Sequence, residues 1–238
     1  MLVEKPLLWL FPGGNFGSVR ASSACIHVRP SGRFASLDSD LAESISALRD
    51  AFTQRHVRAK FGKAEASLVD QLKAQLKIPR RFRDFLLNAN PEDVETRTPA
   101  ERVKLIPAQR LAEEQNGFAL VESGTLRSGA APNGWRAGWI IVGHSSLLGD
   151  PYFLDVSSPD AEGDCPVYTA MSGTDTWKPR LCASSFAMFL RILAVGMDVA
   201  KGFPEEDIDM DDEQVFREAL GPKIREHDPA ALKAGHWT

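Results

Sequence analysis

A Gly-His-Ser run at residues 143–145 is the part of the sequence that comes nearest to catalytic machinery. It follows an apolar, β-branched run, and a strand that leads into Gly-x-Ser begins the nucleophile elbow of α/β-hydrolases, in which the serine attacks a carbonyl carbon. The elbow needs a small residue two positions after the serine, where this chain has Leu147. It also needs a helix next, which Gly149 and Pro151 disfavour. A serine hydrolase that uses Ser145 is therefore only a remote alternative.

The other residue types that could do chemistry are scattered. Asp155 and His227 could complete a triad by residue type, but no spacing connects them to Ser145. The five histidines lack the H-E-x-x-H pattern, and the acidic run Asp207–Asp212 lacks the glycine and the distal glutamate of a calcium loop. The three cysteines lack C-x-x-C spacing, which favours reduced, buried thiols. We therefore predict no catalytic residue, no metal site, no cofactor and no enzyme activity.

The composition is that of an ordinary globular protein. The chain has 238 residues, of which 43% are apolar and 25% charged, so it can bury a core without disulfides. Its net charge of −4 and its pI of about 5.8 argue against nucleic acid as the main ligand. The apolar run Leu7–Phe11 is too short to span a bilayer, and Glu4 and Pro6 are not typical of a signal peptide. We expect a cytoplasmic protein that binds neither nucleic acid nor membranes.

The elements that would position any site centre on a predicted β-hairpin. Trp139–Val142 is an apolar, β-branched run that predicts a buried strand. Pro151–Asp155 returns to aromatic and apolar residues after a short polar segment. The two runs predict antiparallel neighbours, with Gly149-Asp150 at the corner between them.

Three segments before the hairpin have apolar residues at helical spacing. The first predicted helix is Asp40–His56, with Asp40 and Glu43 placed as a capping box. The second is Lys63–Leu76, and Pro79 can start a third helix, because proline is tolerated in the first helical turn.

The remaining segments are less regular. Residues 98–106 allow either a short helix capped near Thr98 or a strand over Val103–Ile106. The other expected elements are short strands at Leu7–Phe11 and Cys25–Val28, a helix over Pro107–Gln115, a strand over Phe118–Glu122, a loop over Ser123–Gly134, strands over Cys165–Met171 and Thr174–Leu181, a helix capped by Ser184, an acidic linker over Glu205–Glu213, a short helix from Val215 ended by Gly221-Pro222, and a weakly patterned tail after Arg225.

Four motifs follow one another in this part of the chain: the helix and proline corner of Ala64–Leu86, the Gly-Asp start of a strand at Gly149–Asp155, the strand Pro166–Tyr168, and the closing helix Ser184–Leu190. Their order and spacing resemble those of the SUKH superfamily, which joins bacterial toxin-immunity proteins to a fungal regulator of cell-wall synthesis. The resemblance covers about residues 62–195. The chain departs from the family's pattern at Asn88–Pro91, where the family has Asn-Gly.

The resemblance implies an α+β fold with a mainly antiparallel sheet packed against helices. It also implies a non-catalytic protein-binding domain, an immunity protein that neutralises a cognate bacterial toxin by direct binding. A regulatory or scaffolding module of the same fold is the alternative. We expect three parts: an N-terminal extension at residues 1–60, a SUKH-like domain at 61–197, and an acidic linker with a C-terminal helical tail at 198–238.

The matched motif positions are expected to be mostly architectural. Asp150 and Asp155 are also candidate contacts to a basic partner, although short acidic side chains commonly order neighbouring backbone amides instead. The motif positions are Pro79, Phe82, Phe85, Gly149, Asp150, Tyr152, Asp155, Tyr168, Ser185, Phe186 and Phe189.

Overall fold

The computed structural model describes residues 37–171, 176–204 and 210–238. These residues belong to one compact unit, which extends from Ser36 to Thr238. The two short strands expected at Leu7–Phe11 and Cys25–Val28 lie outside the described residues, and so does the first part of the expected acidic linker.

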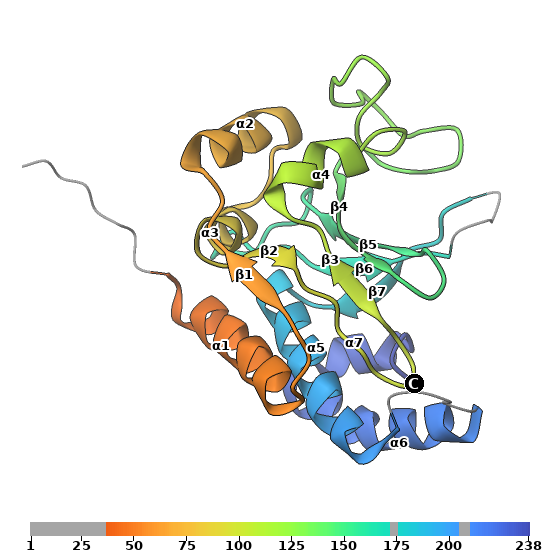
Figure 1. Ribbon diagram of the computed structural model, residues 1–238. Helices are drawn as coiled ribbons and strands as arrows, with labels where there is room; N and C mark the ends of the chain where they lie inside the picture. The colour runs from red at the N-terminus through yellow and green to blue at the C-terminus, as the bar shows by residue number, and fades with distance from the viewer. Residues whose placement is uncertain (1–36, 172–175, 205–209) are drawn as a thin grey trace, which may run out of the picture. The chain divides into compact units, whose positions relative to one another are not determined.

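The strands within the described residues form two antiparallel sheets. They are β1 (Lys60–Gly62), β2 (Asn90–Asp93), β3 (Val103–Leu105), β4 (Trp139–Ser145), β5 (Pro151–Asp155), β6 (Val167–Thr169) and β7 (Arg180–Ala183). The main sheet has the order β3-β4-β5-β6-β7, in which each strand pairs with the next along the chain (Figure 1). Strands β1 and β2 form the smaller sheet.

Helices pack around the main sheet. They are α1 (Ser39–Gln54), α2 (Ala66–Leu76), α3 (Arg80–Ala89), α4 (Ala108–Glu114), α5 (Phe186–Val199), α6 (Met210–His227) and α7 (Pro229–Lys233). Helix α1 lies beside α5, and α5 packs against β7 and α6 (Figure 1). The predicted α+β fold with a mainly antiparallel sheet packed against helices is confirmed. Helices α1 to α4 form where the sequence predicted helices. Of the two alternatives for residues 98–106, the strand is correct, because β3 forms there.

The predicted central hairpin is formed by β4 and β5. Trp139 pairs with Asp155, and Gly149 takes a φ of +74° at the corner, a backbone conformation that favours glycine. The Gly149 amide donates a hydrogen bond to the carbonyl of Ser145 at 2.9 Å, which closes the turn. Because a turn follows β4 where a hydrolase elbow would continue into a helix, Ser145 does not lie on a nucleophile elbow.

The core is aromatic on both sides of the sheet. On one side, the Phe186 ring of α5 packs edge-on against Phe82 and Phe85 of α3, with ring centroids 5.0 and 5.1 Å apart. On the other side, Trp135 packs against Phe153 of β5 with a centroid distance of 4.8 Å. These rings are almost fully buried, and large apolar surfaces of this kind contribute most of the stabilising free energy of such a domain.

A buried carboxylate fixes the start of α5. Asp164 is fully buried, and its side chain accepts hydrogen bonds from the backbone amides of Phe186 and Ala187 at 2.8 and 3.1 Å. The Arg81 guanidinium of α3 lies 3.4 Å from the same carboxylate and 2.9 Å from Asp38. Arg81 thus connects the N-terminal ends of α1 and α5, where Asp38 and Asp164 accept from backbone amides that have no acceptor within their own helix.

The two predicted helix caps are displaced by a residue or two. Helix α1 is capped by Asp38, whose side chain accepts from the Asp40 amide, so Asp40 and Glu43 do not form the expected capping box. Glu43 lies 3.3 Å from Arg191 of α5 instead. Helix α5 is capped by Ser185, which accepts from the Met188 amide, and not by Ser184.

Two predicted strands are wrong or displaced. Residues 118–122 form turns joined by isolated bridges, because the buried Ala119 and Leu120 pack against the core without a pairing strand. The strand expected over Thr174–Leu181 is replaced by β7, which begins at Arg180; residues 172–175 lie outside the described part of the chain.

The C-terminal prediction fails at Gly221-Pro222. Helix α6 continues through this pair to His227, because Phe216, Leu220 and Ile224 bury one face of the helix against the core. The residues after Arg225 are ordered by α7 and by Trp237, whose indole N–H donates to the Cys182 carbonyl at 2.8 Å. Residues 211–213 of the expected linker form the first turn of α6.

Candidate binding cleft

A cleft of about 830 Å³ opens between α6 and one end of the main sheet. Its lining comes from segments far apart in the sequence, which the fold brings together. The segments are the loop 99–101, the hairpin turn 147–150, residues 169–171 from the end of β6, the segment 176–180 that leads into β7, the first half of α6, and His236.

Exposed apolar side chains gather at this cleft. Leu147, Leu148 and Met171 line it, and Leu148 is 70% exposed. They account for three of the five large apolar side chains that are exposed within the described residues. A fourth, Met210, lines a neighbouring hollow along α6. Exposed large apolar groups that collect at one hollow are typical of a binding surface, whereas isolated ones are not informative.

The two leucines are held on a well-bonded turn. The Leu148 amide donates to the hydroxyl of Ser145 at 3.2 Å, and the Ser146 amide donates to the Arg102 carbonyl at 2.7 Å. The turn is therefore fixed both internally and to the loop before β3. A surface presented in this way loses little conformational entropy when a ligand binds.

Two cationic side chains line the cleft from the segment 176–180, which leads into β7. Lys178 and Arg180 are exposed, and Pro179 between them restricts the backbone. Trp177 anchors the segment, because its amide donates to the Asn133 carbonyl at 3.0 Å and its ring packs on Trp135 at 5.3 Å. The fold thus fixes the backbone positions from which these two charged side chains extend.

The α6 wall carries a paired arginine. Arg217 donates from Nε to the Glu213 carboxylate at 2.9 Å, and from Nη1 to the His236 carbonyl at 3.1 Å. These bonds connect α6 to the C-terminal segment and neutralise the charge of Glu213 locally.

Two polar side chains that line the cleft, Glu101 and His236, are bonded to the buried side chains of Ser145 and Tyr152 beneath it. Ser145 donates its hydroxyl hydrogen to Glu101 at 2.7 Å, and the hydroxyl of Tyr152 lies 3.1 Å from Nε2 of His236. Burial raises the pKa of the Glu101 carboxyl, and hydrogen bonds from Ser145, Arg102 and Tyr152 offset part of that rise. Burial likewise raises the pKa of Tyr152.

The pKa of His236 is shifted downward, opposite to those of Glu101 and Tyr152. Its burial, together with the charges of Arg217 and Arg180, lowers the pKa of His236 to about 3. The imidazole is therefore neutral at physiological pH. Ionisable groups whose pKa values are shifted in opposite directions within one cleft point to a functional surface more often than an ordinary surface does.

The cleft does not assemble a hydrolytic triad. Ser145 is 2% exposed, and its hydroxyl is bonded to a carboxylate rather than to an imidazole. The side chain of His144 bonds to Glu114 and that of His236 to Tyr152, so neither can activate this serine as a base. Within the described ranges, no group of three or more His, Cys, Asp or Glu side chains could hold a metal ion.

The structure separates the predicted motif positions into two groups. Asp150 lines the cleft, Gly149 lies in the hairpin turn between the lining residues Leu148 and Asp150, and Tyr152 is buried beneath, bonded to the lining residue His236. The buried group lies in the core or at its corners: Phe82, Phe85, Phe186 and Phe189 are at most 1% exposed, while Pro79 caps α3 and Ser185 caps α5.

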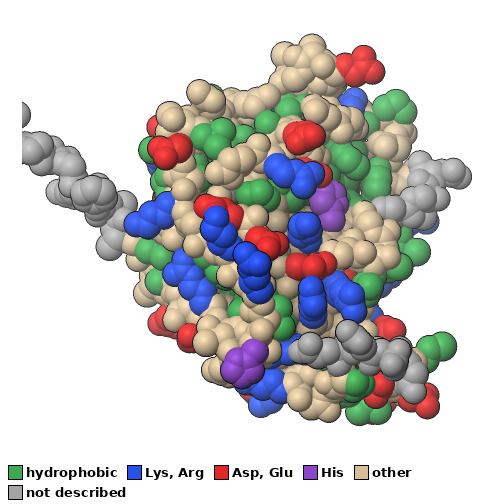
Figure 2. All heavy atoms as spheres, in the orientation of Figure 1, with side chains coloured by type: hydrophobic (Ala, Val, Ile, Leu, Met, Phe, Trp, Pro, Cys, Tyr) green, Lys and Arg blue, Asp and Glu red, His purple; other side chains and the backbone are tan. Residues whose placement is uncertain are grey.

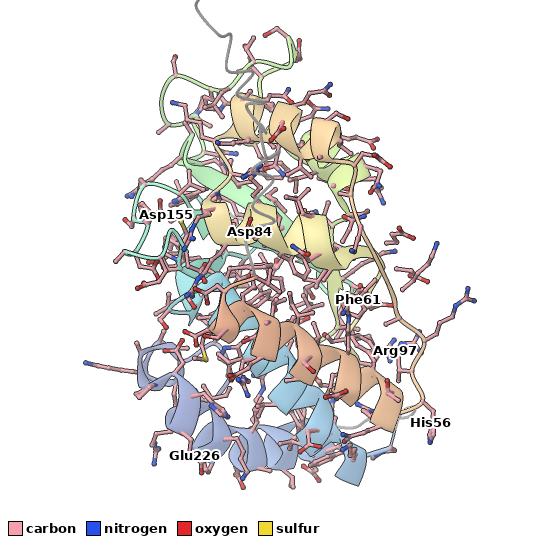
Figure 3. All side chains as sticks on the ribbon, turned by 90° about the vertical axis from the view of Figure 1, so that its left-hand side faces the viewer. His56, Phe61, Asp84, Arg97, Asp155 and Glu226 are labelled. Carbon is pink, nitrogen blue, oxygen red and sulfur yellow. The ribbon has the colours of Figure 1, made fainter. Side chains whose placement is uncertain are left out.

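Asp155 and Tyr168 lie away from the cleft. Asp155 accepts a hydrogen bond from the Ser157 amide at 3.1 Å, which orders the turn after β5. Burial, and to a smaller extent the charge of Asp155, raises the pKa of Tyr168. In Figure 3, Asp155 lies on the opposite side of the view from His56, Phe61 and Arg97. Asp150 directly precedes β5 and Asp155 ends it, so the length of the strand separates the two carboxylates, and only Asp150 lines the cleft.

Sequence reasoning missed most of the cleft. No spacing pattern connects the charged and titratable side chains of the cleft, because four separate parts of the chain supply them: Glu101, Lys178 with Arg180, Arg217, and His236. The Leu147-Leu148 pair inside a predicted turn was the available signal, since two adjacent large apolar residues are unusual in a turn.

A second charged surface is a weaker candidate. Figure 2 shows basic and acidic side chains interleaved over the region of β1, β2 and β3. Lys60 pairs with Glu92 at 2.6 Å, and Arg97 lies 4.0 Å from Glu95. A hollow of about 280 Å³ beside them is lined mostly by charged side chains of both signs. Charges that pair among themselves in this way are typical of a solvated face.

Comparison with known proteins agrees with this architecture. None of the helices in the described ranges is both long and apolar enough to cross a bilayer. No curated protein matches the chain. The family model described as SMI1 / KNR4 family (SUKH-1) matches residues 64–192, which is more than half of the chain and includes α2 to α4, the main sheet and the start of α5. The chain therefore belongs to the SMI1/KNR4 (SUKH-1) family.

Proposed function

We propose that this chain is a protein-binding module, and that it acts as an immunity protein by binding and neutralising a cognate bacterial toxin. Two general properties of the family support the proposal: SUKH domains are generally non-catalytic, and the family includes immunity proteins. The partner would be a protein, with no cofactor and no chemical step.

The observation that carries the proposal is the pair Leu147 and Leu148 on the bonded hairpin turn. Both side chains are more than half exposed, and both line the cleft. Two leucine side chains are unfavourable in water. Covering them with a partner would stabilise the complex by up to about 1.5–3 kcal/mol for each side chain that becomes fully buried. Hot spots of protein interfaces combine an apolar anchor with a charged rim, and this cleft has both.

The mechanism would be steric masking by a preformed surface. Because the turn and the segment before β7 are fixed by their own hydrogen bonds, the chain would bind as a nearly rigid body. A toxin surface held against the cleft would be prevented from reaching its target. Complementary charges would aid the encounter between the two proteins.

A regulatory or scaffolding module of the same fold is the second candidate. The cleft takes Glu213, Arg217 and His236 from the part of the chain beyond residue 192, where the family match ends. A surface built partly from this extension would suit a partner particular to this chain. Stable association with a host protein in the absence of any toxin would favour this candidate.

The test uses the product of the gene adjacent to this one as the candidate toxin. Co-expression should restore the growth of cells that produce the toxin, and the two proteins should copurify in a stoichiometric complex. The variant Leu147→Asp/Leu148→Asp should abolish both effects. Val215→Asp is the matched control, because Val215 is 54% exposed on α6 and does not line the cleft. Neither complex nor rescue with the unaltered protein would contradict the immunity function for that pair.

A further inference from the structure

Three carboxylates and three cationic side chains line the cleft, but they differ in whether they already have a partner of opposite charge. Lys178 and Arg180 form no ion pair with any carboxylate in the described part of the chain. Arg217 is paired with Glu213 on the opposite wall. Lys178 and Arg180 are thus the two charges left for a ligand to neutralise.

The carboxylates that line the cleft already take part in interactions within the protein. Glu213 is held by Arg217, and Glu101 accepts from the hydroxyl of Ser145 and from the Arg102 amide at 2.7 and 2.9 Å. Asp150 lies at the hairpin corner and takes part in an interaction of its own. Glu101 and Glu213 thus already have donors, so an anionic ligand at Lys178 and Arg180 would gain more from charge pairing than a basic ligand would gain from these two carboxylates.

The apolar side chains lie in the same cleft as these cations. Leu147, Leu148 and Met171 line it together with Lys178 and Arg180. A ligand that fits must present an anionic group and an apolar group close together. A segment of chain in which Asp or Glu alternates with Leu or another large apolar residue has this chemistry.

We propose that the cleft binds an acidic, apolar segment of the partner protein. A carboxylate of that segment would pair with Arg180 and Lys178, and a neighbouring apolar side chain would pack on Leu147 and Leu148. The planar guanidinium of Arg180 can bind both oxygens of one carboxylate, while the Lys178 ammonium acts as a point charge. This inference rests on the proposed protein-binding function and specifies the partner's contact segment.

The sign of the charge is what makes the inference specific. The net charge of −4 alone favours a basic partner, and Asp150 and Asp155 were the candidate contacts to it. The cleft reverses this expectation locally, because unpaired cations lie beside its exposed leucines. Association should weaken as salt is added, since exposed charges are screened within about 8–10 Å at physiological ionic strength.

The first arm of the test uses synthetic peptides and amide NMR of the isotope-labelled full chain. The probe is the acetylated, amidated peptide Gly-Ser-Glu-Leu-Asp-Leu-Gly-Ser. The matched probes replace Glu and Asp with Gln and Asn, or with Lys. We expect the acidic peptide to shift the amide signals of Leu147, Leu148 and Arg180, and the neutral and basic peptides to leave them in place at the same concentration.

The second arm uses charge reversal with a matched control. Lys178→Glu/Arg180→Glu should weaken binding of the acidic peptide by about tenfold or more, which corresponds to the loss of a charge-assisted contact. Lys63→Glu/Lys73→Glu carries the same net charge, and both lysines are exposed and outside the cleft. This control should bind like the unaltered protein. The dispersion of the amide spectrum reports whether each variant is folded.

The outcomes separate this inference from the proposed function. No shift of cleft signals by the acidic peptide at millimolar concentration, or equal weakening in both double variants, would overturn the acidic-segment inference. The protein-binding function would still stand if the toxin complex forms and the leucine variant disrupts it. Failure of the complex with the unaltered protein would instead contradict the immunity function for that pair of proteins.

Discussion

Ser145 and Glu101 are joined by a hydrogen bond of 2.7 Å, which ties the end of β4 to the loop before β3 beneath the cleft. The serine that most resembled a nucleophile in the sequence is thus a donor to a partly buried carboxylate. It also accepts from the Leu148 amide, so one hydroxyl supports both Glu101 and the turn that presents the leucines. The bond makes Ser145 a structural residue of the binding surface.

Ser145→Ala should destabilise the protein by about 1–3 kcal/mol, because a charged acceptor and a turn amide both lose their partner. The pKa of Glu101 should rise further, since the bond from Ser145 lowers it. Urea unfolding measures the first effect. Ser146→Ala is the control: its side chain is exposed and forms no hydrogen bond within the described residues, so its effect should stay within about 0.5 kcal/mol.

The same residue tests the hydrolase alternative. A fluorophosphonate probe should not label Ser145, because no histidine side chain contacts its hydroxyl among the described residues. Labelling of Ser145 in the unaltered protein, with esterase activity that is lost in Ser145→Ala, would contradict a non-catalytic role.

His236 should make stability depend on pH in the acidic range. Its pKa is lowered to about 3 in the folded protein, whereas histidine in an unfolded chain titrates near about 6.5. As the pH falls between these values, the unfolded chain takes up a proton that the folded protein does not, so stability should fall by at most about 1.36 kcal/mol per pH unit. Glu101 contributes to the pH dependence of stability with the opposite sign, because its pKa is raised in the folded protein.

The comparison with His236→Gln isolates this contribution. Glutamine can keep a hydrogen bond to the hydroxyl of Tyr152 but cannot titrate, while Glu101, Arg217 and Arg180 remain in both proteins. The loss of unfolding free energy between pH 7 and pH 5 should be smaller in the variant. An equal loss in the two proteins would show that His236 is not the group responsible.

Asp164→Asn should be among the most destabilising single changes, at about 3 kcal/mol or more. It removes a fully buried negative charge that two amides of α5 and the Arg81 guanidinium share. Thermal and urea unfolding measure the change. The matched control is Asp84→Asn on α3, whose carboxylate has no partner within the described residues and should cost no more than about 0.5 kcal/mol. Similar losses in the two variants would contradict the anchoring role.

Trp237→Ala should destabilise the protein by about 3–5 kcal/mol, the usual cost of truncating a buried aromatic side chain. The indole is 5% exposed and donates to the Cys182 carbonyl of β7. Thr238→Ala, at an exposed position next to it, should have little effect. A small effect of the tryptophan variant would mean that the C-terminal segment contributes little to the fold.

The sequence predicted the regular parts of the fold well, because their signals are local. The apolar spacing of Phe82, Phe85 and Leu86 predicted α3, and the glycine at position 149 predicted the hairpin corner. The order and spacing of the four motifs identified the superfamily. Each of these patterns depends only on neighbours along the chain.

The failures occur where tertiary contacts override local preference. Gly221-Pro222 reads as a helix stop, yet α6 runs through it because Phe216, Leu220 and Ile224 are buried on one face. The cleft was not predictable for a similar reason. Lys178, Arg217 and His236 become neighbours only after the chain folds, and their spacing in the sequence is unrelated to their function.

The most direct test of the account is the affinity of the chain for the adjacent gene's product, measured by isothermal titration calorimetry. We predict a stoichiometric complex that Leu147→Asp/Leu148→Asp weakens by about 30-fold or more, as expected for interface hot spots, while Val215→Asp binds like the unaltered protein. A tight complex whose affinity is the same for all three proteins would contradict the central claim that this chain binds its partner through the cleft.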